Sequence, residues 1–282
     1  CHSLQSIAIP DSVTSIGEHA FSFCSGLTSF SIPSGLSEIR ESMLGTCTGL
    51  RYVTIPEKVQ NIHPSSFYGC SSLKEFVVSE ANEWFTSRDG VIYSKDLSKL
   101  VLVPNGMEGT LEIGKLVTTI SDYSLAGCSK LDSVIIPEGV VSIGNESFDG
   151  CSGLRSIVVP NSIKTIGIYA FDGCSELASI TLPYSMEAIG SGAFSFCTKL
   201  ESITIPHGIG ELSTMLFRRC AKLTSVVIPE DIEAIEDSAF AECRELVSID
   251  IPESVLSIGH RCRLIAVSLI QLGSSRGHTH RR

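Results

Sequence analysis

Cysteine is the residue of this sequence whose type and spacing could carry chemistry. Ten of the eleven cysteines recur at 23-residue intervals in two runs, separated by one wider gap: Cys1, Cys24, Cys47, Cys70, Cys128, Cys151, Cys174, Cys197, Cys220 and Cys243. No C-x-x-C pair occurs and no histidine shares the frame, which disfavours a zinc site. Disulfides are disfavoured because side chains stacked in register point in parallel. We therefore expect a column of buried, unreactive thiols, with Cys262 outside the frame.

The other reactive side chains show no catalytic pattern. The seven histidines stand at different positions of the repeat and gather with no carboxylate pair, whereas general acid–base catalysis needs groups that converge in a pocket. The stretch "GSGAF" at 190–194 lacks the lysine of a phosphate-binding loop. We expect no enzyme activity, no cofactor and no bound metal.

The cysteine frame belongs to a longer repeat, C-x-x-L-x-x-I-x-I-P-x-x-V-x-x-I-G-x-x-A-F-x-x-C. Apolar residues alternate with Ser and Thr before the proline, as at 179–182, which predicts a short strand with one buried face. A second extended piece ends at a glycine such as Gly167, and the "AF" pair, as at Ala170-Phe171, is expected on a brief helical turn. A fixed period of this length predicts a solenoid of stacked coils over residues 1–259.

The repeat closely resembles the BspA-like leucine-rich repeats of the Treponema type, as in "LRSIVVPNSIKTIGIYAFDGC" at 154–174. The resemblance covers residues 1 to about 259. It implies a leucine-rich-repeat solenoid of short parallel β-strands, and a microbial protein at the cell surface or secreted that binds other proteins, often in adhesion.

Composition limits the classes of partner. The chain has 282 residues, is 43% hydrophobic and carries a formal charge of −10, which disfavours nucleic-acid binding. No run of about 18 apolar residues is present, so no transmembrane segment is expected. The chain starts inside the repeat frame, and we expect it to be a piece of a longer protein, with a signal peptide or anchor, if any, outside this sequence.

The gap between Cys70 and Cys128 holds a variant segment, residues 79–113, in which "VIY" (91–93) and "LVLV" (100–103) predict a β-hairpin. Trp84, Phe85 and Tyr93 cluster there. These aromatic residues are candidate anchors for a partner. The alternative is that they pack the hairpin against the solenoid.

Small hydroxyl residues form rows on the exposed strand face, and we expect them to contribute to an interaction surface: Ser156, Ser179, Thr181, Ser202 and Thr204. The alternative is that Ser and Thr simply suit an exposed strand. The repeat stops near residue 259, because Arg263 falls at the buried ring position. Residues 260–282 form a basic tail, read either as a cap or as a non-native end.

The sequence therefore predicts a non-enzymatic module that binds other proteins or surface glycans, at the cell surface or secreted. Two alternatives remain at this point. One is an intracellular leucine-rich-repeat scaffold, and the other is a spacer for a catalytic domain that lies outside this fragment.

Overall fold

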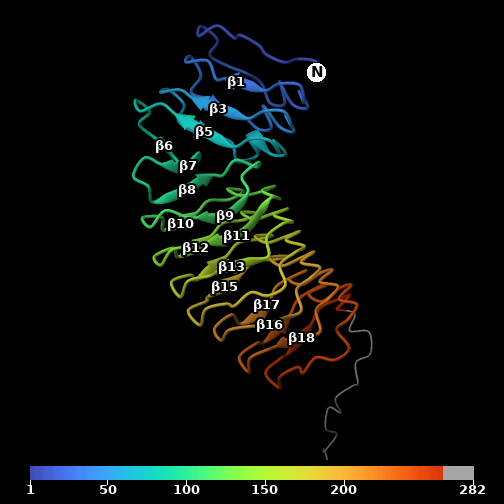
Figure 1. Cartoon of the computed structure of the whole chain (residues 1–282). Helices are drawn as coiled ribbons and strands as arrows, with labels where there is room; N and C mark the ends of the chain where they lie inside the picture. Colours follow the sequence, from blue (N-terminus) through green and yellow to red (C-terminus); the bar gives the residue numbers. More distant parts are fainter. Residues whose placement is uncertain (263–282) are drawn as a thin grey trace, which may run out of the picture.

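A computed structural model of the chain describes residues 1–262, which form a curved, elongated stack of coils (Figure 1). The strands of the coils lie in two rows, and most regular coils contribute one strand to each row. The first row contains β1 (Ser29–Ser31), β3 (Tyr52–Ile55), β5 (Glu75–Val78), β9 (Gly109–Glu112), β11 (Leu131–Ile135), β13 (Ser156–Val158), β16 (Ser202–Thr204) and β18 (Ser225–Val227). The second row contains β2 (Glu38–Ile39), β4 (Asn61–Ile62), β8 (Lys99–Leu102), β10 (Thr119–Ile120), β12 (Ser142–Ile143), β14 (Thr165–Ile166), β15 (Ala188–Ile189), β17 (Glu211–Leu212), β19 (Ala234–Ile235) and β20 (Ser257–Ile258).

The strands of neighbouring regular coils pair in parallel, and each residue pairs with its own copy 23 residues away. Ser133 lies beside Ser156 in the first row, and Thr165 lies beside Ala188 in the second. This register confirms the predicted solenoid. It also explains the constancy of the inward residues, because each one packs against its equivalents in the coils above and below. No helix in residues 1–262 is long and apolar enough to cross a membrane.

The third side of the coil differs from the expected helical turn. Within the described residues a 3₁₀ helix occurs only at Pro64–Phe67. In most other coils the "AF" pair lies between two residues with positive φ, such as Tyr169 at 51° and Gly173 at 70°. Left-handed residues stop a helix from propagating. They also turn amides toward the next coil, so the N–H of Phe171 donates to the carbonyl of Ala193 at 2.8 Å. A third hydrogen-bonded ladder results.

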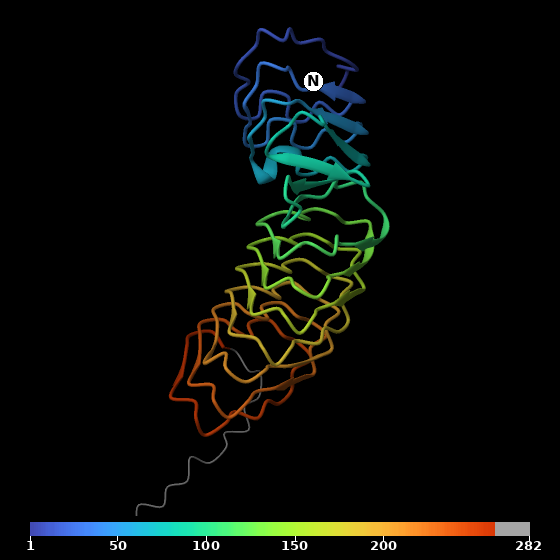
Figure 2. The ribbon, with the colours of Figure 1, turned by 90° about the vertical axis from the view of Figure 1, so that its left-hand side faces the viewer.

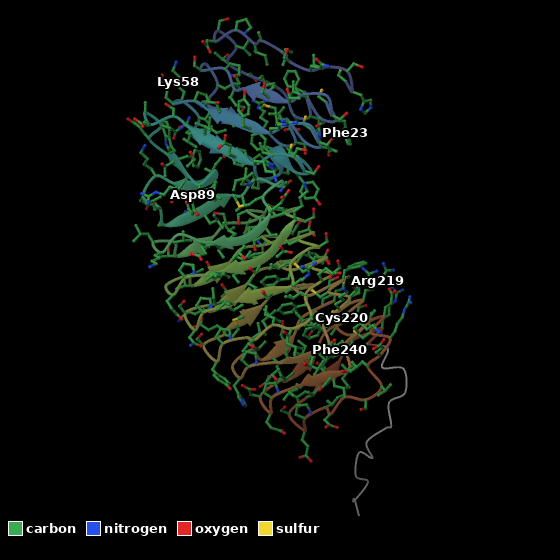
Figure 3. All side chains as sticks on the ribbon, viewed as in Figure 1. Phe23, Lys58, Asp89, Arg219, Cys220 and Phe240 are labelled. Atoms are coloured by element: carbon green, nitrogen blue, oxygen red, sulfur yellow. The ribbon has the colours of Figure 1, made fainter. Side chains whose placement is uncertain are left out.

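Residues at the same position of the coil lie on the same side of the molecule along the stack. Phe23 and Arg219 precede cysteines at equivalent points of distant coils, have φ of 60° and 62°, and lie on the same side of the molecule (Figure 3). Lys58 and Asp89 lie on the opposite side (Figure 3). A given residue number within the coil therefore predicts which surface a side chain faces.

Aromatic rings form one column of the core. Five rings stack at centroid distances of 4.9 to 5.8 Å with interplanar angles of 1° to 19°: Phe148, Phe171, Phe194, Phe217 and Phe240. All five are essentially inaccessible to solvent. Parallel stacking follows from the repeat itself, because each ring stands at the same coil position as the one before it.

The cysteine column runs beside the rings. Nine of the eleven cysteines are buried free thiols, as the 23-residue frame predicts, whereas Cys1 is exposed and Cys262 is half-buried. Along the column the thiol donates to a main-chain carbonyl of the preceding coil, for example Cys197 Sγ to Phe171 O at 3.2 Å and Cys220 Sγ to Phe194 O at 3.0 Å. A thiol at this position is small and apolar and still satisfies a buried acceptor.

The regular stack is interrupted by one long coil. The predicted hairpin is confirmed as β7 (Val91–Ser94) paired antiparallel with β8, and a strand that was not predicted, β6 (Phe85–Arg88), pairs antiparallel with β7. The coil that starts at Cys70 ends at Asn105, which stands 23 residues before Cys128 and replaces a cysteine. The Asn105 side chain donates to the carbonyl of Ala126 at 2.6 Å.

The insertion divides the interior into two cores. Ile92 and Leu102 pack with the N-terminal core, while Val91, Tyr93 and Leu100 pack with the larger C-terminal core. The axis of the stack bends at this point (Figure 2). The strands β7 and β8 therefore act as a partition between two otherwise regular ladders.

Candidate interaction surfaces

The outward face of the first strand row is a regular surface that runs along the stack. All five hydroxyl residues predicted for it are exposed: Ser156, Ser179, Thr181, Ser202 and Thr204. The intervening isoleucines point inward and are buried. Strand alternation thus keeps one face for the core and leaves the other open to a partner.

Apolar side chains break the hydroxyl rows, a feature that the sequence analysis missed. Ile135 and Val158 are neighbours in the β11–β13 register and are 40% and 59% exposed. Val158 occupies the coil position of Thr181, and Val227 at the same position is 53% exposed. The sequence does contain a signal for these exposed apolar residues, because valine stands at positions where other coils have threonine. Exposed apolar residues among small hydroxyls provide contact area that a purely polar face lacks.

Ion pairs between neighbouring coils lie beside the strand face. Arg155 pairs with Asp132 at 3.1 Å, and both side chains are largely exposed, so this pair contributes little to stability. Glu108 joins the two halves of the stack, since it accepts from Lys74 at 2.6 Å and lies 3.4 Å from Lys130. The hydrogen bond from Lys74 holds the pKa of Glu108 below its ordinary value. The charged groups thus form a border to the hydroxyl and apolar rows.

The three aromatic residues of the insertion have different environments. Tyr93 is 5% exposed in the larger core, so it packs the insertion and presents no surface to a partner. Burial raises its pKa. Phe85 is partly buried against the N-terminal core. Trp84 is 40% exposed and is the one of the three that offers ring surface to solvent.

Asn82 positions Trp84 and Phe85. It is fully buried, and its amide nitrogen donates to the carbonyls of Pro56 at 2.9 Å and Val59 at 2.8 Å. Its amide oxygen accepts from the main-chain N–H groups of Trp84 at 2.9 Å and Phe85 at 2.7 Å. One side chain therefore replaces a piece of the coil-to-coil ladder and directs the chain away into β6.

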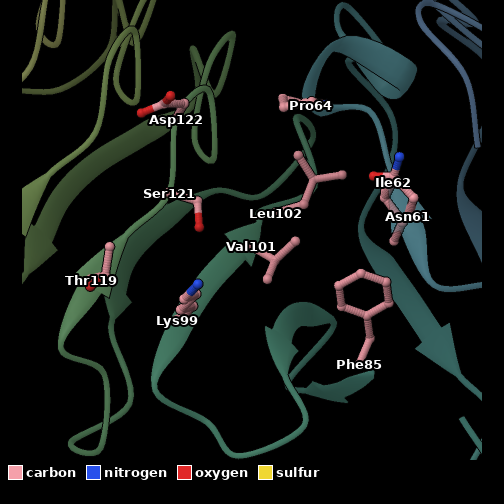
Figure 4. Close-up of a pocket in the computed structure, with 10 residues that line it drawn as sticks. All are labelled: Asn61, Ile62, Pro64, Phe85, Lys99, Val101, Leu102, Thr119, Ser121 and Asp122. Carbon is pink, nitrogen blue, oxygen red and sulfur yellow. The ribbon is translucent and has the colours of Figure 1, made fainter. Parts of the chain in front are cut away.

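A cavity of about 440 Å³ lies where β6 leaves the stack. Its wall on one side comes from β4 and Pro64, on the other from β8 and β10, with the Phe85 ring between them (Figure 4). The lining residues are Asn61, Ile62, Pro64, Phe85, Lys99, Val101, Leu102, Thr119, Ser121 and Asp122. Such a volume is within the range of ligand-binding clefts.

Two stacked carboxylates on the third side have perturbed ionisation. Burial, reinforced by the charge of Asp172, raises the pKa of Asp149 to about 6. Burial likewise raises the pKa of Asp172. No group of three or more His, Cys, Asp or Glu side chains suited to a metal occurs in residues 1–262.

Comparison with known families identifies the repeat. The BspA type Leucine rich repeat region matches residues 1–106, 109–223 and 141–263 in six copies. The chain belongs to this family. Its BspA-type coils account for the 23-residue period and for the inward columns of leucine, phenylalanine and cysteine. No curated protein matches the sequence.

Solved structures show the same fold. The BspA-type chain is similar to a leucine-rich repeat protein from Eubacterium ventriosum ATCC 27560, with 22% sequence identity, a TM-score of 0.75, and coverage of 93% of this chain and 84% of that one. It is also similar to the pneumococcal vaccine antigen PcpA, with 27% identity, a TM-score of 0.63, and coverage of 89% and 61%. A leucine rich cell surface protein from Faecalibacterium prausnitzii A2-165 has 23% identity and a TM-score of 0.56, with coverage of 86% and 62%. The chain thus spans less than two thirds of the latter two proteins.

Proposed function

We propose that this chain is a non-enzymatic binding module of a cell-surface or secreted microbial protein, which recognises other proteins or surface glycans in adhesion. The observation that carries the proposal is the outward face of the first strand row, where exposed Ile135 and Val158 adjoin rows of small hydroxyls. Such a face is flat and repetitive, so a large partner can contact several coils at once.

The similar proteins favour a surface location. One of them is called a cell surface protein and another a vaccine antigen. Leucine-rich repeats generally serve as binding scaffolds, and the strand face supplies the contact area that this role needs. Trp84 is a second contact point of the proposal, because it is partly exposed and its main chain is fixed by the buried Asn82.

The test compares two double variants of the chain. Ile135→Glu with Val158→Glu places two charges on the strand face, and Val141→Glu with Ile168→Glu places two charges at residues of similar exposure, 43% and 48%, outside the first strand row. Beads coated with each form are mixed with immobilised extracellular proteins, glycan arrays and cells. We expect the first variant to lose binding by at least about tenfold, which corresponds to about 1.4 kcal/mol, and the second to bind like the native chain.

Equal binding by both double variants would rule out the strand face as the contact surface. Trp84→Ala is measured in the same assay, after its thermal unfolding has been shown to match that of the native chain. We expect a weaker response, since a partly exposed aromatic on a fixed main chain is a common binding anchor. Unchanged binding would show that Trp84 is not part of the surface that contacts the partner.

A further inference from the structure

The second strand row is broken between β4 and β8. In the preceding coils the carbonyls of Ser37 and Ile39 accept from the N–H groups of Gln60 at 2.9 Å and His63 at 2.8 Å. The equivalent carbonyls in the β4 coil belong to Gln60 and Ile62, and no N–H of the described residues donates to either one. The strand β4 therefore presents two acceptors at an open edge.

The long coil withdraws the donors that would have filled this edge. In the 23-residue frame the donors equivalent to Gln60 and His63 would be Glu83 and Thr86. Thr86 pairs instead with Tyr93 in β7, and the N–H groups between these two positions, those of Trp84 and Phe85, donate to the side chain of Asn82. The strand β8 cannot substitute, because β7 and β10 occupy its two edges. A cleft is left beside β4, and it is the cavity of about 440 Å³ described above.

We propose that this cleft binds an extended peptide segment of a partner protein, which adds to β4 as a parallel strand. The carbonyls of Gln60 and Ile62 require two N–H donors three residues apart, and an extended peptide supplies them at the spacing seen in the regular coils. Phe85 and Val101 give the cleft an apolar wall for an aliphatic side chain between the two donors. This cleft is separate from the strand face of the first row.

The chain itself provides the probe. In the segment Asn161–Gly167, with the sequence NSIKTIG, the N–H of Lys164 donates to Val141 O and the N–H of Gly167 donates to Ile143 O, both at 2.9 Å. A fluorescent synthetic peptide of this sequence can make the same two bonds to β4. A second peptide is methylated on these two amide nitrogens, which removes the donors and keeps the side chains.

Two matched variants locate the binding. Thr119→Trp fills the cleft, and Thr165→Trp introduces the same ring at the same coil position two coils further on, outside the cleft. Binding is followed by fluorescence anisotropy with the whole chain, and circular dichroism confirms that both variants are folded. We expect saturable binding that falls by at least about tenfold with the methylated peptide and with Thr119→Trp, and that stays unchanged with Thr165→Trp.

Three results would overturn the proposal. The first is no saturable binding of the unmethylated peptide below about millimolar concentration. The second is equal affinity of the methylated peptide, which would show that side chains and not strand addition hold it. The third is equal binding by Thr119→Trp and the native chain, which would place the peptide elsewhere.

Discussion

Alkaline pH should destabilise this solenoid strongly, because its buried thiols resist ionisation. Burial raises the pKa of Cys70 and Cys128 from 9.0 to about 12. Burial also raises the pKa of Cys243 to about 12, and it raises those of Cys151 and Cys174 well above the ordinary value. In the unfolded chain these thiols ionise at their ordinary pKa.

The direction in which stability changes with pH follows from the number of protons that the native and unfolded states bind. Between pH 9 and pH 12 the unfolded state has released a proton that the native state keeps, so the free energy of unfolding falls as pH rises. The contribution of each thiol is fully present below its unfolded pKa and is lost on the way to its folded pKa. Each thiol accounts for up to about 1.4 kcal/mol per pH unit in this window. Five such thiols remove about 7 kcal/mol by pH 10, which is comparable with the whole stability of an ordinary domain.

Urea unfolding followed by circular dichroism, in the presence of reductant, measures this slope between pH 7.5 and pH 10. Cys174→Ala should remove about 1.4 kcal/mol of the total loss of stability between pH 7.5 and pH 10, because Cys174 is fully buried. Cys1→Ala is the matched control and should leave the slope unchanged, since Cys1 is exposed. A native chain of constant stability up to pH 10, or a Cys174→Ala slope equal to that of the native chain, would refute the reasoning.

Substitutions at Phe194, Asn82 and Gly167, with a control at Gly17, test the packing by thermal or urea unfolding. Phe194→Ala should lower the free energy of unfolding by about 3–5 kcal/mol, because it empties the middle of the ring column. Phe194→Leu should lower it by less than about 1.5 kcal/mol, since Leu125 fills the same coil position naturally. Equal losses for the two variants would contradict this reasoning. Asn82→Ala should cost about 3 kcal/mol because the Val59 carbonyl and the N–H groups of Trp84 and Phe85 lose their bonds to its side chain, and a loss below about 0.5 kcal/mol would contradict its role. Gly167→Ala should destabilise by about 2 kcal/mol, because its new Cβ would lie 2.5 Å from main-chain atoms of the preceding coil. Gly17→Ala, at the same coil position in the first coil with nothing within 4 Å, should be tolerated, and an equal loss there would contradict the clash.

The sequence was sufficient for the regular coils because one physical rule repeats in them. Alternation around Ile180 gave the strand face, and the cysteine interval gave the register that the strand pairing confirms. The prediction of a brief helical turn at Ala170-Phe171 was wrong. Propensity for a local helix does not account for the amide of Phe171, which bonds to the next coil instead of to its own turn.

The irregular coil was harder to predict because its contacts are not repeated. Residue 105 stands where the 23-residue interval would place a cysteine, but it is an asparagine, so the interval alone did not reveal it. Its role is visible only in its hydrogen bonds to the carbonyl of Ala126 and to the N–H of Gly69. The polar sequence of β6 likewise has no periodic equivalent. Tyr93 shows the same limit, since whether an aromatic of an insertion is exposed or buried depends on which core it meets.

Where the 23-residue register holds, neighbouring coils lie close together, because forward-facing carbonyls such as those of Val141 and Ile143 accept from N–H groups of the next coil. Any cleft within the stack must therefore coincide with a departure from the register, and the largest departure is the long coil after Cys70. Asn82 satisfies the carbonyl of Val59 and gives a second bond to the carbonyl of Pro56, which already accepts from the N–H of Val59. Gln60 and Ile62 receive no such replacement, although they lie only a few residues further along the same strand region. The protein thus closes the buried part of the break and leaves its outer edge available to the main chain of another molecule.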